Sequence, residues 1–94
     1  MYALFYDYVD DIVERRAPHR ERHLALYREW QKSGRLLMGG AVGDPPYGAL
    51  IVFDVQDPSE VEAFAASDPY VLEGLVTGRR VEPWAVVWPA PASR

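Results

Sequence analysis

Residues 2–8 form the most aromatic stretch of the chain, and they alternate between two sides. One side of an extended chain here carries Tyr2, Leu4, Tyr6 and Tyr8, and the other carries Ala3 and Phe5. Side chains alternate across a β-strand, and a strand that is apolar on both sides is buried on both sides. The pattern therefore predicts a central strand over 2–8.

Two helices are predicted further along the chain. After Pro18, apolar residues recur at helical spacing until Ser33-Gly34, which predicts a helix over 18–33. The run Asp57-Pro58-Ser59-Glu60 has a capping residue, a proline at the first helical position and an acid at the third. It predicts a second helix that ends near Ser67, because Pro69 disfavours helix in the residue before it. A short helix is expected to follow over 68–74.

Three more strands are predicted. Residues 36–42 and 49–55 are joined by a turn-rich segment and are expected to form a hairpin. Residues 81–88 are expected to form the last strand, with apolar side chains on both faces. Its Pro83 lacks a backbone N–H, which places this strand at a sheet edge or a bulge. The tail from Pro89 is expected to be loose.

This order of elements predicts an α+β, ferredoxin-like βαββαβ fold with an antiparallel sheet. Both helices should cover one face of the sheet, with the first strand central and the last at an edge. Because both faces of the last strand are apolar, a monomer would expose too much apolar surface. We therefore predict a homodimer that packs its open sheet faces together.

Composition narrows the class of protein. A chain of 94 residues suits a single domain over 1–94. It has no cysteine for disulfides or thiolate metal sites and no apolar run near the roughly 20 residues that span a bilayer. A net charge of −4 disfavours nucleic acid and anionic membranes as partners. We expect a cytoplasmic protein that takes a small-molecule ligand.

Positive charge is concentrated along the first predicted helix. Of the 10 basic residues, seven lie between positions 15 and 35, around His23: Arg15, Arg16, Arg20, Arg22, Arg28, Lys32 and Arg35. This local excess favours a small anion over a polyanion. For most of these arginines, a solvated helix face is the simpler interpretation.

His23 and Asp68 are the candidate catalytic residues. His23 borders the apolar side of its helix, where a histidine is more often a satisfied core residue than a catalyst. Asp68 is equally well explained as the cap of the short helix that begins at Pro69. If the fold brings the two together, the carboxylate can orient the imidazole and leave its other nitrogen free to take a proton from a ligand.

Other chemistries find less support. His19 and His23 are spaced i, i+4 and could hold a metal if Asp68 supplied a third ligand, but we favour the pair over a metal site. No serine lies in a nucleophile-elbow pattern. Gly39-Gly40 lacks the lysine of a phosphate loop and is expected to allow a close approach of backbone or ligand. No metal and no cofactor are expected.

Three segments together resemble a known family. They are Arg20-Glu21-Arg22-His23-Leu24, the turn from Ser33 to Gly40, and Asp68-Pro69-Tyr70-Val71 followed by Gly74. They look like the YciI-like (YCII-related) proteins over nearly the whole chain. The resemblance implies the dimeric α/β barrel superfamily and a proposed active-site pair that falls on His23 and Asp68. One branch includes a dehydrochlorinase of chlorinated hydroxyquinones, which implies that acid-base chemistry without a cofactor is possible on this scaffold.

The leading hypothesis is a small enzyme in which His23 moves a proton on an anionic or phenolic ring compound, in a lyase- or isomerase-like reaction. Arg20, one turn before His23, could meet a carboxylate or phenolate, and Tyr70 could line the pocket. The alternative is a ligand-binding or accessory module without turnover. A haem-binding relative is a third possibility, although the two histidines are the only residues that suggest an axial ligand.

Overall fold

A computed structural model describes residues 1–88 of the chain. Its elements, in chain order, are β1 (Tyr2–Tyr8), α1 (Ile12–Arg15), the 3₁₀ helix η1 (Ala17–His19), α2 (Arg20–Lys32), β2 (Leu36–Val42), β3 (Gly48–Phe53), α3 (Pro58–Ser67), α4 (Pro69–Leu72) and β4 (Val76–Pro83). The predicted loose tail from Pro89 lies outside the described residues.

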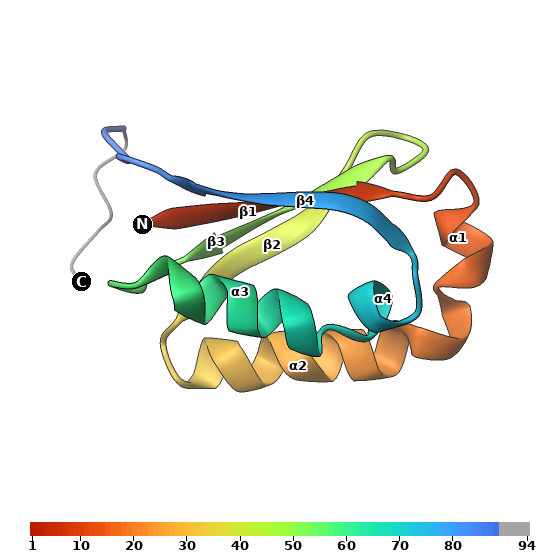
Figure 1. Ribbon diagram of the computed structural model, residues 1–94, viewed down its shortest axis with the longest axis horizontal. Helices are drawn as coiled ribbons and strands as arrows, with labels where there is room; N and C mark the ends of the chain where they lie inside the picture. Colours follow the sequence, from red (N-terminus) through yellow and green to blue (C-terminus); the bar gives the residue numbers. More distant parts are fainter. Residues whose placement is uncertain (89–94) are drawn as a thin grey trace.

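The four strands form one sheet in the order β2-β3-β1-β4, and all neighbouring strands are antiparallel. Figure 1 shows α2, α3 and α4 on one side of this sheet, while the other side is left open. The predicted ferredoxin-like α+β fold is confirmed, with β1 central and β4 at an edge. The β2–β3 hairpin is also where the sequence placed it.

The core lies between the sheet and the helices. Side chains from the helix-facing side of β1 and β3 meet the apolar sides of α2 and α3, and Leu4, Ile51, Phe53, Val61 and Phe64 are fully buried there. Trp30, Phe53 and Phe64 pack edge to face, with ring centroids 5.1–6.0 Å apart. This packing fixes α2 on the sheet and so sets the position of every residue that α2 carries.

The predicted helix signals are confirmed. Gly34 adopts φ 79° after α2, and the Arg35 N–H donates to the Trp30 carbonyl, which is a Schellman ending. At the start of α3 the Asp57 side chain accepts from the Ser59 N–H, and this bond lowers the pKa of Asp57. None of the described helices is long and apolar enough to cross a membrane.

The prediction for the last strand was wrong. β4 covers residues 76–83, and residues 84–88 belong to no strand. β4 pairs with β1 from Tyr8 down to Tyr2, and the final backbone bond runs from the Trp84 N–H to the Met1 carbonyl. Residues 84–88 pair with none of the four described strands, whatever their apolar pattern. The pattern of 81–88 therefore no longer supports an apolar open face.

The segment between β1 and α2 is more ordered than the sequence suggested. It contains α1 and η1, so that helical backbone runs almost continuously from Ile12 to Lys32. Ile12 is buried in a second small cluster with Tyr70 and Leu75. This contact ties α1, which leads into α2, to Tyr70 of α4.

Candidate active site

Asp68 lies at the junction of α3 and α4, and its side chain is fully buried. It precedes Pro69 and has the extended backbone, φ −71° and ψ 122°, that a residue before proline prefers. Its Oδ1 accepts a hydrogen bond from the Tyr70 N–H at 3.0 Å, so Asp68 caps α4. The sequence interpretation of Asp68 as a helix cap is therefore confirmed.

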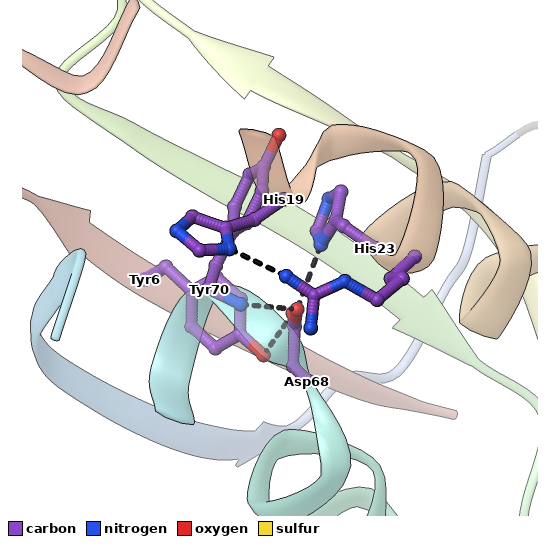
Figure 2. Close-up of polar contacts among 6 residues, drawn as sticks. Tyr6, His19, His23, Asp68 and Tyr70 are labelled. Carbon is purple, nitrogen blue, oxygen red and sulfur yellow. Dashed lines mark hydrogen bonds and ion pairs between the residues drawn. The ribbon is translucent and has the colours of Figure 1, made fainter. Parts of the chain in front are cut away.

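The same carboxylate also contacts His23, which comes from the second turn of α2, 45 positions away in the sequence. His23 Nδ1 lies 2.8 Å from Asp68 Oδ1, as Figure 2 shows. An ionised carboxylate can only accept, so Nδ1 carries the proton and donates it. In a neutral imidazole, Nε2 is then left as a free acceptor.

Tyr6, from β1, completes the set of donors around Asp68. Its hydroxyl donates to Asp68 Oδ2 at 2.8 Å (Figure 2). Burial raises the pKa of Tyr6, and the Asp68 charge raises it further, so the phenol stays protonated and remains a donor at neutral pH. Asp68 thus receives three hydrogen bonds, which compensate for its burial.

Aromatic rings hold the imidazole in place. The Tyr70 ring stacks on His23 with centroids 3.7 Å apart and planes 3° from parallel, and Tyr27 lies against it at 4.6 Å. The Tyr70 hydroxyl is buried and has no hydrogen-bond partner within residues 1–88. Burial of a hydroxyl without a hydrogen-bond partner costs folding free energy. The Tyr70 hydroxyl therefore indicates that a ligand or a water molecule supplies a polar atom here.

A cavity of about 160 Å³ lies beside His23, between α2 and the edge strand β2. It is lined by Tyr8, Arg16, Arg20, His23, Leu24, Tyr27, Tyr70 and residues 39–41. A cavity of about 150 Å³ can bind benzene, so this one has room for one small ring. Gly39 shapes its wall, because a Cβ there would lie 2.7 Å from the Tyr27 ring.

Known proteins resemble this chain in sequence and in fold. The YCII-related domain family matches residues 1–85. The chain belongs to this family. This YCII-related protein is 28% identical over 96 residues to an uncharacterized protein of Haemophilus influenzae. The alignment covers 93% of this chain and 98% of that one.

A solved structure has a similar fold. It is 5-chloro-2-hydroxyhydroquinone dehydrochlorinase from Burkholderia phenoliruptrix AC1100, in complex with 2,5-dihydroxybenzoquinone. The TM-score is 0.73 with 22% identity, over 90% of this chain and 94% of that one. At this identity the likeness shows the fold alone.

The structure gathers the predicted site residues of this YCII-related protein around one cavity. His23, Arg20 and Tyr70 line it, and Asp68 lies behind His23. His19 does not line it: its Nδ1 contacts Arg22 at 2.6 Å and its Nε2 lies 4.0 Å from Glu73. No group of three or more potential metal-ligating residues occurs among the described residues, so His19, His23 and Asp68 do not form the alternative metal site.

Sequence reasoning missed four residues of the site. The sequence placed Tyr6 and Tyr8 on one side of the first strand, but only the fold shows that they reach Asp68 and the cavity. Tyr27 lies one turn after His23, and Arg16 lies four positions before Arg20. Helical spacing could have suggested both, had the helical segment before α2 been recognised.

Proposed function

We propose that this protein is a small cytoplasmic enzyme, without a cofactor, in which His23 moves a proton on an anionic or phenolic ring compound in a lyase- or isomerase-like reaction. The observation that carries this proposal is the buried His23–Asp68 hydrogen bond at the wall of the cavity. It leaves Nε2 as the one imidazole nitrogen available to a ligand.

In the proposed step, His23 Nε2 accepts a proton from carbon or oxygen of the bound ring, and the electron pair of the broken bond stays on the ring. The electron pair is delocalised and either expels a leaving group or is reprotonated elsewhere by the imidazolium. Asp68, 2.8 Å from Nδ1, stabilises the imidazolium charge, and the stacked Tyr70 ring adds a cation–π contribution.

Two observations support a single ring as the ligand. The cavity has the volume of one small ring, and four of the residues that line it are aromatic. The related dehydrochlorinase is named for a chlorinated hydroxyhydroquinone and was solved with a dihydroxybenzoquinone. A phenolic or quinol-like ring is therefore the class of ligand to try first.

A second candidate is a ligand-binding module without turnover. It is favoured by the low exposure of His23, 4%, because the Tyr70 ring covers one face of the imidazole. Tight enclosure suits a structural histidine, whereas a general base must reach its ligand. Catalysed proton transfer decides between the two candidates.

Deuterium exchange tests the proposal even though the product of the reaction is unknown. Substituted phenols, hydroquinones and hydroxybenzoquinones are incubated with the protein in D₂O, and loss of ring C–H signals is followed by NMR. We expect exchange above the background rate with the wild type, and none above it with His23→Gln. His19→Gln, at the histidine outside the cavity, should retain the wild-type rate. If no compound exchanges faster than in buffer, the binding module is the better description.

Asp68→Asn isolates the charge of the carboxylate. An asparagine oxygen can keep the bonds from His23 and Tyr70, while its NH₂ group donates to the Tyr6 oxygen, so orientation survives and only the charge is lost. Loss of a charge-assisted bond, about 1.5–3 kcal/mol, should slow exchange roughly 10- to 100-fold. An unchanged rate would show that Asp68 acts only as a cap.

We also propose that two copies of the chain pack through the open face of the sheet. That face carries Met38, Leu50, Val52 and Trp84 around an apolar hollow of about 280 Å³. The support for this proposal is thus the apolar hollow with the exposed Met38 and Trp84 side chains beside it, not the wrongly predicted strand over 81–88. A second copy of the same face is the occupant because it offers the same apolar surface and the Arg80–Glu82 pair beside it.

A further inference from the structure

Two arginines beside the cavity have no acidic partner in the described part of the chain. The arginine ion pairs within residues 1–88 are Arg15–Asp11, Arg35–Glu60, Arg79–Glu62 and Arg80–Glu82. Arg16 and Arg20 belong to none of them, yet both line the cavity with His23. Arg16 is also half-buried. The cavity mouth therefore carries positive charge that the protein itself does not neutralise.

The backbone holds these two arginines on one side of a helical segment. Arg16 is the C-cap of α1, with φ −75° and ψ −20°, Arg20 begins α2, and η1 connects them with helical geometry. Residues four apart on helical backbone lie next to each other. Ile12, one turn before Arg16, is buried against Tyr70, so the segment is anchored to the site.

The electrostatics of Tyr8 indicate that the two charges act at the same place. Burial raises the pKa of Tyr8, while Arg16 and Arg20 both oppose that rise. The Tyr8 side chain lines the same cavity. The buried Tyr70 hydroxyl, which has no partner within residues 1–88, independently indicates that a polar ligand atom belongs here.

We propose that Arg16 and Arg20 form a clamp for an anion that presents two coplanar oxygens, and that this clamp holds the ring against His23. That the ligand is a ring rests on the proposed function. The clamp specifies which class of substituent that ring carries. Guanidinium groups match such an anion because each offers parallel N–H donors. A ring carboxylate and the adjacent oxygens of a hydroxyquinone anion share this chemistry.

Binding of three ring compounds tests the clamp: 4-hydroxybenzoate, 2,5-dihydroxybenzoquinone and the uncharged 4-hydroxybenzamide. Their dissociation constants are measured by NMR titration or calorimetry. At least one anionic compound should bind at least tenfold more tightly than the amide. Tighter binding of the benzoate identifies a carboxylate as the substituent, and tighter binding of the quinone identifies the hydroxyquinone oxygens.

The matched variants are Arg16→Gln, Arg20→Gln and Arg28→Gln. Each removes one positive charge, but Arg28 is exposed on α2 and does not line the cavity. We expect the first two to weaken binding of the anion about tenfold and Arg28→Gln to change it less than twofold. Arg16→Lys keeps the charge but loses the two parallel N–H donors of the guanidinium group. Its affinity for the anion should lie between those of Arg16→Gln and the wild type.

Equal affinity for the anions and the amide, failure of both anions to bind, or wild-type affinity in Arg16→Gln would each overturn the clamp. These results are separate from the exchange test. If the protein catalyses deuterium exchange but substitution of either arginine leaves the affinity for the anions unchanged, the clamp is overturned and the enzyme proposal stands. If binding of the anions depends on the arginines but no compound exchanges deuterium faster than in buffer, the clamp stands and the enzyme proposal is overturned.

Discussion

At the scale of single residues, Asp68 has two roles that sequence reasoning treated as alternatives. Its Oδ1 caps α4 through the Tyr70 N–H and also accepts from His23. A carboxylate oxygen has more than one lone pair, so capping does not prevent the second bond. The cap also assists the pair, because the bond from the Tyr70 N–H holds the carboxylate in the orientation in which Oδ1 contacts His23.

Tyr6→Phe should destabilise the protein without opening a cavity. It removes the donor to Asp68 Oδ2 and leaves a buried carboxylate with two hydrogen bonds in place of three. We expect the free energy of unfolding in urea to fall by about 1–3 kcal/mol. Tyr2→Phe, on the same side of β1 and half-buried, is the control and should change it by less than about 0.5 kcal/mol. Equal losses in the two variants would contradict a special role for the Tyr6 hydroxyl.

Alkaline pH should destabilise the fold through three tyrosines. Burial raises the pKa of Tyr6, Tyr8 and Tyr27 above the ordinary value of about 10. A pKa raised by folding gives stability that is complete below the unfolded pKa and is lost as the pH rises through the folded pKa. The free energy of unfolding should therefore be flat near pH 8 and fall above about pH 10, by up to about 1.4 kcal/mol per pH unit for each tyrosine.

The measurement is urea unfolding at several pH values between 8 and 11. In Tyr6→Phe one of the three groups is absent, so its decline above pH 10 should be shallower than that of the wild type. Parallel declines would mean that Tyr6 makes no contribution to the alkaline loss of stability.

At the scale of elements, capping and breaking residues predicted the structure best. Pro58, Pro69 and Gly34 impose local backbone geometry, so α2, α3 and α4 lie close to their predicted positions. β4 could not be found this way, because its extent is set by the length of β1 rather than by its own pattern of Val76, Gly78 and paired arginines. α1 was missed because four residues carry too little periodicity to be recognised.

The same distinction explains the site. His23 and Asp68 could be singled out by residue type and by resemblance, since each lies at a recognisable helix position. Tyr6 and Tyr8 could not, because their roles depend on which elements pack together. Long-range packing is the part of this site that a single sequence does not encode in any local pattern.

β2 offers an element-scale test with two adjacent glycines. A Cβ at Gly39 would lie 2.7 Å from the Tyr27 ring and 3.2 Å from Ile51, whereas nothing lies within 4 Å of one at Gly40. Gly39→Ala should displace Tyr27 and lower the free energy of unfolding by about 1–3 kcal/mol. Gly40→Ala should be neutral or stabilise by up to about 1 kcal/mol, because it restricts the unfolded chain.

NMR identifies the cause of any loss in Gly39→Ala. Tyr27 lies 4.6 Å from His23, so its displacement should change the ring-current shift of the His23 ring protons. Destabilisation with unchanged His23 shifts would place the strain at Ile51 and argue against Gly39 as the residue that admits Tyr27 to the cavity wall.

At the scale of the whole molecule, β2 separates two features. Residues 39–41 line the candidate site on the helix side and also the apolar hollow on the open face. A partner packed on that hollow would support the strand that forms the wall of the site. Assembly and ligand binding are therefore expected to reinforce each other through β2.

Met38→Lys tests this arrangement, with Leu72→Lys as its control. Both side chains are exposed in one copy of the chain, 65% and 67%, but Met38 lies on the open face and Leu72 on the short helix α4 on the other side. Sedimentation analysis should find the wild type and Leu72→Lys as dimers and Met38→Lys as a monomer, because two lysines would face each other across an apolar interface.

Monomeric Met38→Lys should then bind 4-hydroxybenzoate or 2,5-dihydroxybenzoquinone more weakly than the dimer. Dimers of all three proteins would place the interface elsewhere, and a monomer with wild-type affinity would show that the site needs no support from a second copy.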